Sequence, residues 1–266
     1  MPTLNCLYYE PERFLAATAS PPQYDRSSGL LAGMVPHHLL ASDMIAGFFN
    51  IAAKGDFERV VIVAPSHYPE ECGQDVVTAL ADWVTPTGTV RCDREATRQL
   101  LSNEFVAAED NPRALEKDHG VAGLIPFVKH YLPDAKVMVC LLSNRLTEER
   151  RAQASRLLRE LCADGKTLLV ASVDCSHYLG PEEAATMDEI TAAAIESFDL
   201  GTVMTFGDSN IDSPQTVSVL LELAADQQLT IKRLDHSSSA EKQPQAYSHP
   251  LYSDGLTTYF VYAFSQ

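Results

Sequence analysis

The stretch VVIVAPSH, residues 60–67, decides the fold and contains the first candidate functional residue. Five consecutive apolar residues, mostly β-branched, predict a strand that is buried on both faces of a sheet. Because proline cannot donate a hydrogen bond to a neighbouring strand, Pro65 predicts the end of this strand. His67 then follows the carboxyl end of a buried strand, which is the edge where open α/β sheets bind ligands.

Similar apolar runs recur along the chain and alternate with helical patterns. The predicted strands cover residues 30–35, 58–64, 137–142, 167–172, 229–234 and 257–264, and the predicted helices cover residues 40–53, 93–101, 119–131, 147–165, 181–198 and 212–226. Strands that alternate with helices imply an α/β fold, with a mainly parallel central sheet and helices on both faces. No linker or internal repeat divides the sequence, so we expect a single domain over 1–266 with an irregular leader over 1–27.

Four segments between these elements give weaker signals. Residues 76–80 and 83–85 alternate and precede Pro86, which predicts a hairpin or a strand pair at the sheet edge. Residues 105–107 are a short strand candidate, and Pro126 predicts a bend or a new first turn inside the helix over 119–131. The polar, serine-rich segment 236–254 is expected to be a loop. We expect the pocket walls to come from the loops at 68–75, 109–118 and 236–254.

The composition excludes several classes of function. A net charge of −16 over 266 residues argues against nucleic acid or an anionic membrane as the main partner. The amino-terminal residues show no signal-peptide pattern, and no apolar run approaches the roughly 20 residues that a membrane span requires. The six cysteines are scattered without a C-x-x-C pair, which favours free thiols in a reducing cytoplasm.

Polar groups follow three of the predicted strands. They are Pro36-His37-His38, Pro65-Ser66-His67 and Asp174-Cys175-Ser176-His177. If these strands are parallel, their carboxyl ends share one edge of the sheet and the histidines can meet there. Imidazole suits iron, zinc, copper or nickel, and two histidines with one carboxylate leave coordination positions open. Asp212, before the last helix, is a candidate for that carboxylate.

Each candidate also has a purely structural interpretation. Asp212 before Ser213-Pro214 fits a helix N-cap, and Asp174 and His177 fit residues that cap a turn. A catalytic cysteine is the weaker alternative, because Cys175 follows a buried strand without the glycines of a nucleophile elbow. No glycine-rich nucleotide-binding motif occurs. The joint occurrence of three strand-end histidine motifs favours a shared site.

The chain resembles the Memo family, whose members are also known as system protein B of the AMMECR1–Memo–radical SAM group. The resemblance rests on Val35-Pro36-His37, Ala64-Pro65-Ser66-His67, Asp118-His119-Gly120 with Pro126-Phe127, and Ser172-Val173-Asp174-Cys175-Ser176-His177. These motifs occur in the family's order and cover about residues 30–264. The resemblance implies a fold similar to class III extradiol ring-cleaving dioxygenases, which hold Fe(II) with two histidines and a carboxylate.

The resemblance also implies roles for individual residues. His37 and His67 match the two histidine ligands, and three further residues match polar groups that line the same cleft: His119, Asp174 and His177. The family commonly has Cys-Gly before the helix near the carboxyl end, where this sequence has Asp212, with Asn210 as the alternative if the register slips. Asp212 would complete a set of two histidines and one aspartate. A family glutamate is replaced near Gly123, which puts substrate contacts there in doubt.

Three interpretations of function follow. The first is a non-haem Fe(II) oxidoreductase of dioxygenase type that acts on a small-molecule substrate, with His119 or His177 as acid or base. The second is a metal-binding or interaction module without turnover. The third is a Zn²⁺-dependent hydrolase that uses the same ligands, and copper is a further alternative metal. The resemblance implies a radical SAM protein and an AMMECR1-domain protein as partners.

Overall fold

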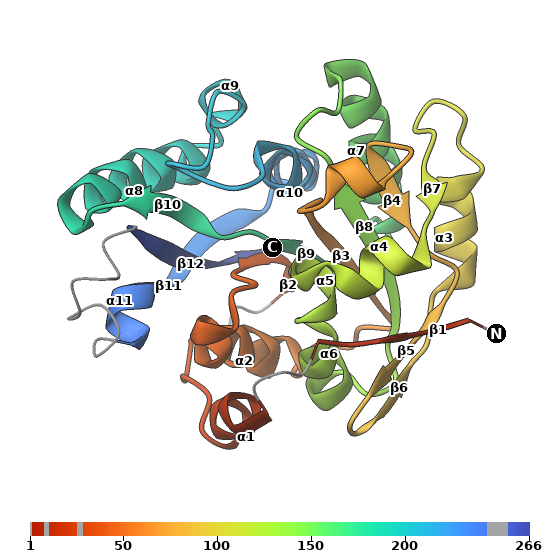
Figure 1. The fold of residues 1–266 in the computed structure, drawn as a ribbon, viewed down its shortest axis with the longest axis horizontal. Coiled ribbons are helices and arrows are strands. Elements are labelled where there is room, and N and C mark those ends of the chain that lie inside the picture. Colours follow the sequence, from red (N-terminus) through yellow and green to blue (C-terminus); the bar gives the residue numbers. More distant parts are fainter. Residues whose placement is uncertain (1, 8–10, 26–28, 244–254) are drawn as a thin grey trace.

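The structure is a computed structural model that describes residues 2–7, 11–25, 29–243 and 255–266 (Figure 1). Its strands are β1 Thr3–Asn5, β2 Leu30–Val35, β3 Arg59–Pro65, β4 Val76–Thr78, β5 Asp82–Thr85, β6 Gly88–Val90, β7 Glu109–Asp110, β8 Lys136–Leu142, β9 Thr167–Ser172, β10 Cys175–Leu179, β11 Thr230–Ser238 and β12 Leu256–Ser265. Its α-helices are α1 Pro11–Ala19, α2 Ser42–Ala52, α3 Arg94–Leu101, α4 Pro112–Lys117, α5 His119–Ala122, α6 Ile125–Tyr131, α7 Glu148–Leu161, α8 Pro181–Glu196, α9 Leu200–Val203, α10 Pro214–Asp226 and α11 Ser239–Lys242.

A large mixed, mostly parallel sheet forms the centre of this α/β fold. Its strand order is β10-β12-β2-β9-β3-β8-β4-β7, with β11 paired to β12. The four central strands β2, β9, β3 and β8 are parallel to one another, whereas β12 and β4 run antiparallel to their inner neighbours. The predicted parallel sheet is therefore confirmed at its centre. Among the described residues, a second small sheet has the order β1-β5-β6.

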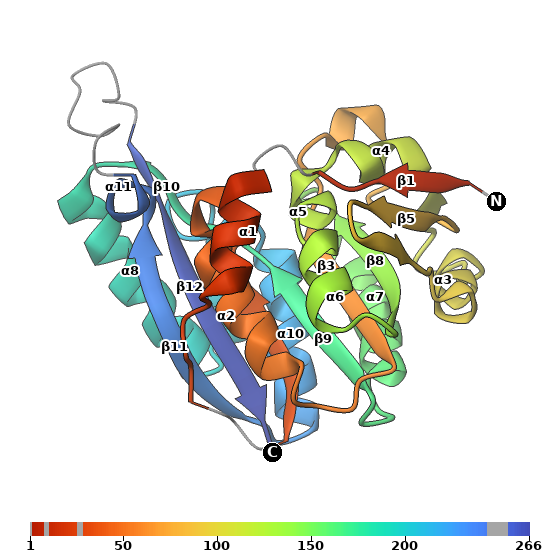
Figure 2. The same ribbon diagram turned by 90° about the horizontal axis from the view of Figure 1, so that it is seen from below.

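Helices cover both faces of the large sheet, as Figures 1 and 2 show. One core packs beneath α1, α2 and α6, and the other packs beneath α7, α8 and α10. Successive side chains of β3 alternate between them: Val60, Ile62 and Ala64 join the first core, and Val61 and Val63 join the second. This arrangement explains why β3 is an unbroken apolar run instead of an alternating one.

The pairing register brings the strand-end motifs together. Val35 at the end of β2 lies opposite Ser172 at the end of β9, and Val63 of β3 lies opposite Ala171. The backbone N–H of Val173 donates to the carbonyl of Val35 at 2.9 Å, which continues the alignment one residue past the strands. The residues that follow β2, β3 and β9 therefore emerge at the same edge of the sheet.

Two predicted strand assignments are wrong. Residues 76–80 and 83–85 do not form a hairpin, because β4 pairs with β8 and β7 while β5 turns at Pro86 to pair with β6 in the small sheet. Residues 105–107 are not a strand, because the side chain of Asn103 accepts hydrogen bonds from the N–H groups of Phe105 and Val106. That local turn satisfies donors which a strand would need.

One helix prediction, the leader prediction and one loop prediction also need revision. The predicted helix over 119–131 is two helices, α5 and α6. Pro126 lies in the first turn of α6, which confirms the prediction that it marks a new first turn. Residues 1–27, expected to be irregular, include β1 and α1. The expected loop over 236–254 begins with the end of β11 and with α11, and its residues 244–254 lie outside the described part.

Two further expectations concern the cysteines and the membrane. All six cysteines are free thiols, as their spacing predicted. Among the described residues, the structure contains no helix with the length and apolar character that crossing a membrane requires.

Candidate metal centre

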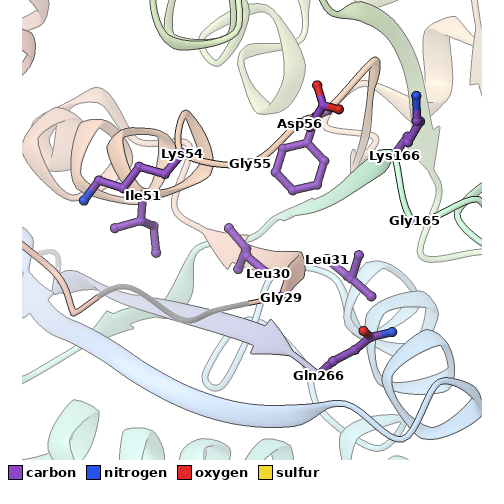
Figure 3. Close-up of a pocket in the computed structure, with 11 residues that line it drawn as sticks. Gly29, Leu30, Leu31, Ile51, Lys54, Gly55, Asp56, Gly165, Lys166 and Gln266 are labelled. Atoms are coloured by element: carbon purple, nitrogen blue, oxygen red, sulfur yellow. The ribbon is translucent and has the colours of Figure 1, made fainter.

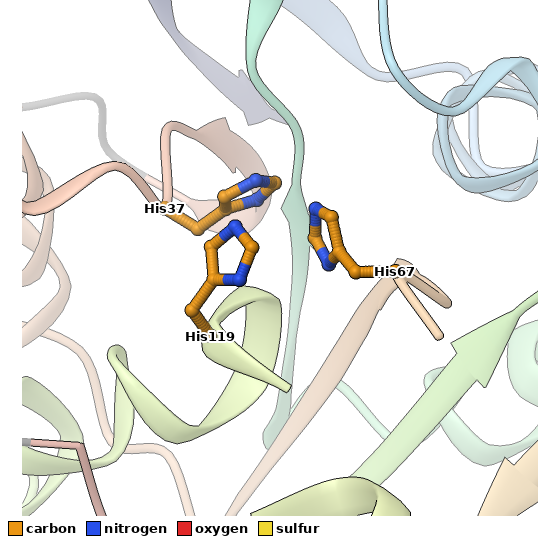
Figure 4. A group of neighbouring side chains, drawn as sticks. All are labelled: His37, His67 and His119. Carbon is orange, nitrogen blue, oxygen red and sulfur yellow. The ribbon is translucent and has the colours of Figure 1, made fainter. Parts of the chain in front are cut away.

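Three histidines converge at the carboxyl edge of the sheet. His37 follows β2, His67 follows β3, and His119 begins α5, and their rings turn toward a common space (Figure 4). One ring nitrogen from each lies within 4.8 Å of the others. The ring centroids of His67 and His119 are 3.9 Å apart, and that of His37 lies 4.9 and 5.0 Å from them. Three imidazoles with this spacing can hold a metal ion.

Asp118 fixes the orientation of His67. Its buried carboxylate accepts hydrogen bonds from the His67 backbone N–H at 2.9 Å and from the ring Nδ1 at 2.7 Å, and it caps α5 by accepting from the Gly120 N–H at 2.9 Å. Because Nδ1 of neutral His67 keeps its proton for this bond, the Nε2 lone pair is left for a metal, as in carboxylate–histidine–metal arrangements. Burial alone raises the pKa of Asp118, but these hydrogen bonds and the positive charge of His67 outweigh it and lower the pKa.

Ser172 gives His37 the corresponding tautomer. The Ser172 hydroxyl donates its only proton to the Gly120 carbonyl at 2.5 Å, so at 3.2 Å it accepts from the His37 Nδ1–H. Neutral His37 therefore also presents the lone pair of Nε2. The two histidine motifs chosen from the sequence both direct Nε2 into the same space.

Two carboxylates face His37 Nε2. Asp212 Oδ2 lies 3.2 Å from this nitrogen and Asp174 Oδ2 lies 3.5 Å from it. Ligand atoms about 2.1 Å from one metal ion are roughly 3.0–3.4 Å apart at bond angles of 90–109°, so the first distance suits two ligands of one ion. Asp212 Oδ1 is buried without any hydrogen-bond partner. Such an orphaned oxygen fits a metal ligand, because buried polar atoms otherwise have partners.

Asp174 has a structural task at the same place. Its Oδ1 accepts from the His37 backbone N–H at 3.0 Å, and its carbonyl accepts from the Asp212 N–H at 3.1 Å. Asp174 thereby joins the loop that follows β2 to Asp212, two residues before α10. The cap of α10 is Ser213, whose hydroxyl accepts from the Thr216 N–H, so the N-cap interpretation of Asp212 is wrong.

The two innermost histidines have opposite pKa shifts. Burial alone lowers the pKa of His37, but attraction to Asp174 and Asp212 outweighs it and raises the pKa to about 9. Burial lowers the pKa of His119 to about 3, with help from the positive charges of His37 and His67. In the metal-free chain, His119 is therefore neutral at pH 7, which disfavours the predicted role as an acid near neutral pH.

We expect the metal-free protein to lose stability between pH 6.5 and pH 9. The folded-state pKa of His37 is raised from 6.5 to about 9, so its contribution is fully present below pH 6.5 and is lost as the pH rises through 9. Urea unfolding midpoints measured across this range will fall with pH in the chelator-treated wild type. A His37→Gln variant, which cannot titrate, will show a flatter profile. Equal slopes in the two proteins would contradict this assignment.

A cavity of about 300 Å³ opens at these residues. Its lining contains every predicted site residue, namely His37, His67, His119, Asp174, His177 and Asp212, together with Pro65, Ser66, Asn144, Tyr178 and Asp208. His177 donates its backbone N–H to the Asp208 carbonyl at 2.7 Å, and its buried Nδ1 has no partner. A side chain with an unused nitrogen in a cavity wall can exchange a proton with a bound molecule.

The sequence interpretation missed three wall residues. Asn144, Tyr178 and Asp208 line the cavity, whereas no described residue of the loops expected to form its walls, 68–75, 109–118 and 236–243, contributes to the lining. The Asn144 side chain donates to the Asp212 carbonyl at 2.8 Å. This bond joins the loop between β8 and α7 to the segment that precedes α10. Of these three residues, only Tyr178 could have been predicted from the sequence, because it directly follows the candidate residue His177. Asn144 and Asp208 lie in loops whose course depends on tertiary packing.

Three other sequence candidates lie elsewhere. Asn210 donates its side-chain N–H to Thr191 Oγ1 at 3.0 Å and does not line the cavity, so Asp212 is the residue presented to the histidines. His38 Nδ1 lies 2.6 Å from the Tyr259 hydroxyl. Cys175 is fully buried, and burial raises the pKa of its thiol well above the ordinary value, which excludes the nucleophile alternative.

A second cavity, of about 380 Å³, lies at the opposite edge of the sheet (Figure 3). Residues before the amino ends of β2, β3 and β9 line it, together with the end of the chain at Gln266. Among the described residues, its walls contain no histidine or cysteine, and their one acidic side chain is that of Asp56. This cavity therefore offers none of the imidazole ligands that gather at the carboxyl edge.

Comparison with known proteins gives one consistent family. The sequence profile of the family described as Memo-like protein matches residues 13–252. The MEMO1 family protein PAE0818 of Pyrobaculum aerophilum is 27% identical over 173 residues, which are 64% of this chain and 61% of that protein. The MEMO1 family protein of Archaeoglobus fulgidus is 30% identical over 146 residues, 54% of each chain. The chain thus matches from about half to three-fifths of these relatives' length.

A solved structure shows the same fold. The uncharacterized protein JW3007 from Escherichia coli K12 superposes with a TM-score of 0.55 over 88% of this chain and 99% of that chain, at 17% sequence identity. At that identity the likeness concerns the fold alone. The profile match extends over all the strand-end motifs and over every residue of the histidine cluster, and the chain therefore belongs to the Memo-like protein family.

Proposed function

We propose that this chain is a metal-dependent oxidoreductase of dioxygenase type, in which His37, His67 and Asp212 hold Fe(II). The observation that carries the proposal is Asp212 Oδ1, a buried carboxylate oxygen without a partner, whose companion Oδ2 lies 3.2 Å from His37 Nε2. Two histidines with one carboxylate form the donor set of non-haem iron oxygenases. When bound in such a site, Fe(II) supplies oxygen-activating chemistry with coordination positions left open.

The remaining cavity residues have distinct tasks in this proposal. His177 lines the cavity with a ring whose Nδ1 is unpaired, and in this proposal it accepts a proton from a substrate hydroxyl. Asp174 holds the His37 backbone and joins it to the Asp212 loop. His119 stays neutral beside the metal ligands because burial and the neighbouring histidines lower its pKa to about 3. The buried Asp118 keeps His67 in the metal-binding tautomer.

Metal analysis of anaerobically purified protein tests this function. We expect about one iron per chain and oxygen consumption with catechols as probe substrates. A His67→Ala variant, prepared in the same way, will lack both because one of three ligands is missing. Protein that binds no metal under any loading condition would rule out both a dioxygenase and a metal-dependent hydrolase. Stoichiometric iron without oxygen consumption by any catechol would favour the non-catalytic metal-binding module.

The three-histidine cluster favours a second candidate, a zinc-dependent hydrolase. Three histidines and an open position form the donor set of some catalytic zinc sites, and His37, His67 and His119 lie within 4.8 Å of one another. In that arrangement His119 is a ligand and Asp212 stays outside the coordination sphere. The dioxygenase candidate therefore requires Asp212 for metal binding, whereas the hydrolase candidate requires His119.

A further inference from the structure

We propose that the cavity selects a substrate that carries a positively charged amino group, and that Asp208 and Tyr178 recognise this group. The inference rests on the proposed function and names the substrate class of the same site. Among the residues that the structure describes, the cavity lining contains three carboxylates, those of Asp174, Asp208 and Asp212, and no lysine or arginine. Apart from the proposed metal ion and the histidines beside it, an anionic substituent would find no cation among these lining residues, whereas an ammonium group would meet an unpaired carboxylate.

Asp208 is the carboxylate that remains available. Asp174 and Asp212 both face His37 Nε2, at 3.5 and 3.2 Å. Asp208 is exposed, and its side chain makes no hydrogen bond or ion pair with any described residue. Its own carbonyl accepts the His177 backbone N–H at 2.7 Å, which fixes Asp208 beside the strand that carries Tyr178. The carboxylate is therefore held at the cavity wall without a partner of its own.

Tyr178 adds an aromatic surface to the same wall. Its side chain is 75% exposed although it lines the cavity, and its ring centroid lies 5.6 Å from that of His177. The φ of Tyr178 is 63°, a left-handed conformation that bulky residues rarely adopt. The backbone of Gly255 packs closely against this residue, since a Cβ added at Gly255 would lie 2.2 Å from the Tyr178 carbonyl carbon. Strained backbone that presents an exposed aromatic ring is typical of ligand-binding positions.

An aromatic face beside a free carboxylate favours organic cations. Ammonium groups bind over tyrosine rings by cation–π attraction and pair with carboxylates at the same time. The net charge of −16 also attracts cations toward the molecule over longer distances. Tyr178 and Asp208 thus offer a binding site for an amino group, and the negative net charge adds an electrostatic field that attracts cations.

A matched series of catechols tests the inference on the anaerobic, Fe(II)-loaded protein. The probes are catechol, 3,4-dihydroxyphenethylamine and 3,4-dihydroxyphenylacetate, which carry at one ring position a hydrogen, a cationic aminoethyl group and an anionic carboxymethyl group. Isothermal titration calorimetry without oxygen gives their affinities. We expect the amine to bind about 10-fold more tightly than catechol, and the carboxylate to bind more weakly than catechol.

Two variants and one control separate local recognition from overall charge. In Asp208→Asn the ratio of amine to catechol affinity will fall toward one, and in Tyr178→Leu it will fall in part. In Asp134→Asn, which removes an exposed carboxylate two residues before β8, the ratio will stay as in the wild type. A ratio that falls equally in Asp134→Asn and Asp208→Asn would overturn the inference in favour of overall charge.

The remaining outcomes distinguish the inference from the proposed function. Catechols that bind with equal affinity, or a carboxylate that binds best, would overturn the amino-group inference and leave the proposed function standing. Iron-loaded protein that binds none of the three probes would count against the proposed function and against this inference together.

Discussion

Replacing Asp212 with alanine will abolish Fe(II) binding, whereas replacing His119 with alanine will preserve it. In the proposed site Asp212 is the third ligand, and its loss leaves His37 and His67 alone. Removing an outer residue of a metal site typically lowers affinity about 10–100-fold, so the loss of a direct ligand should exceed about 100-fold. His119 is the matched control because it lines the same cavity and its ring centroid lies 3.9 Å from that of His67.

Metal content after anaerobic loading with Fe(II), and separately with Zn²⁺, measures this difference. Competition with a chelator of known affinity will convert the contents into dissociation constants. If the His119→Ala variant loses the metal and Asp212→Ala keeps it, the three-histidine set is correct and the hydrolase candidate gains support. An Asp212→Asn variant adds a finer comparison, because the amide keeps one oxygen donor while it removes the charge that favours a divalent ion.

Replacing Asp118 with alanine will destabilise the protein and weaken the metal site together. The change removes the cap of α5 and the buried carboxylate that is the partner of the half-buried His67 backbone N–H and ring. We expect a loss of about 3 kcal/mol in the free energy of unfolding, from an uncompensated buried group and a lost cap. Metal affinity should fall about 10–100-fold because His67 is no longer held in its tautomer.

Urea unfolding of the metal-free variant, followed by metal titration, measures both effects. Asp199→Ala provides the control, since Asp199 caps the equally short helix α9 but lies on the surface outside the cavity. It should lose less stability than Asp118→Ala and keep the wild-type metal affinity. A stable Asp118→Ala protein with normal metal affinity would show that His67 needs no carboxylate to orient it.

Local patterns in the sequence were sufficient to predict the positions of the central strands. The segments 30–35, 58–64, 137–142 and 167–172 each coincide with a strand of the parallel centre within one residue. Burial on both faces produces unbroken apolar runs, which a single sequence displays directly. The short strands at the margins carry no such signal, and β4 and β5 were paired wrongly because their partners are distant in the sequence.

The candidate site was predicted through the same reasoning. His37, His67 and Asp174 follow buried parallel strands, so one sheet edge had to bring them together, and the pairing of Val35 with Ser172 does so. Asp212 was a candidate because a carboxylate before the last helix could complete the set of ligands, and His119 could be included because the chain resembles a known family. Asn144 and Asp208 could not be found, because each lies in a loop whose path depends on neighbouring elements rather than on its own residues.

The sequence by itself determined which strands are buried, where each of them ends and which potential metal ligands follow those ends. The tertiary structure alone decided the finer chemistry: the Ser172 and Asp118 contacts that select the histidine tautomers, the unpaired oxygen of Asp212, and the acidic, lysine-free wall with Tyr178 and Asp208. The physical reason is the separation in sequence of the residues that interact. Apolar periodicity is a property of neighbouring residues, whereas hydrogen bonding and burial of a side chain depend on segments that are far apart in the sequence and adjacent only in the folded chain.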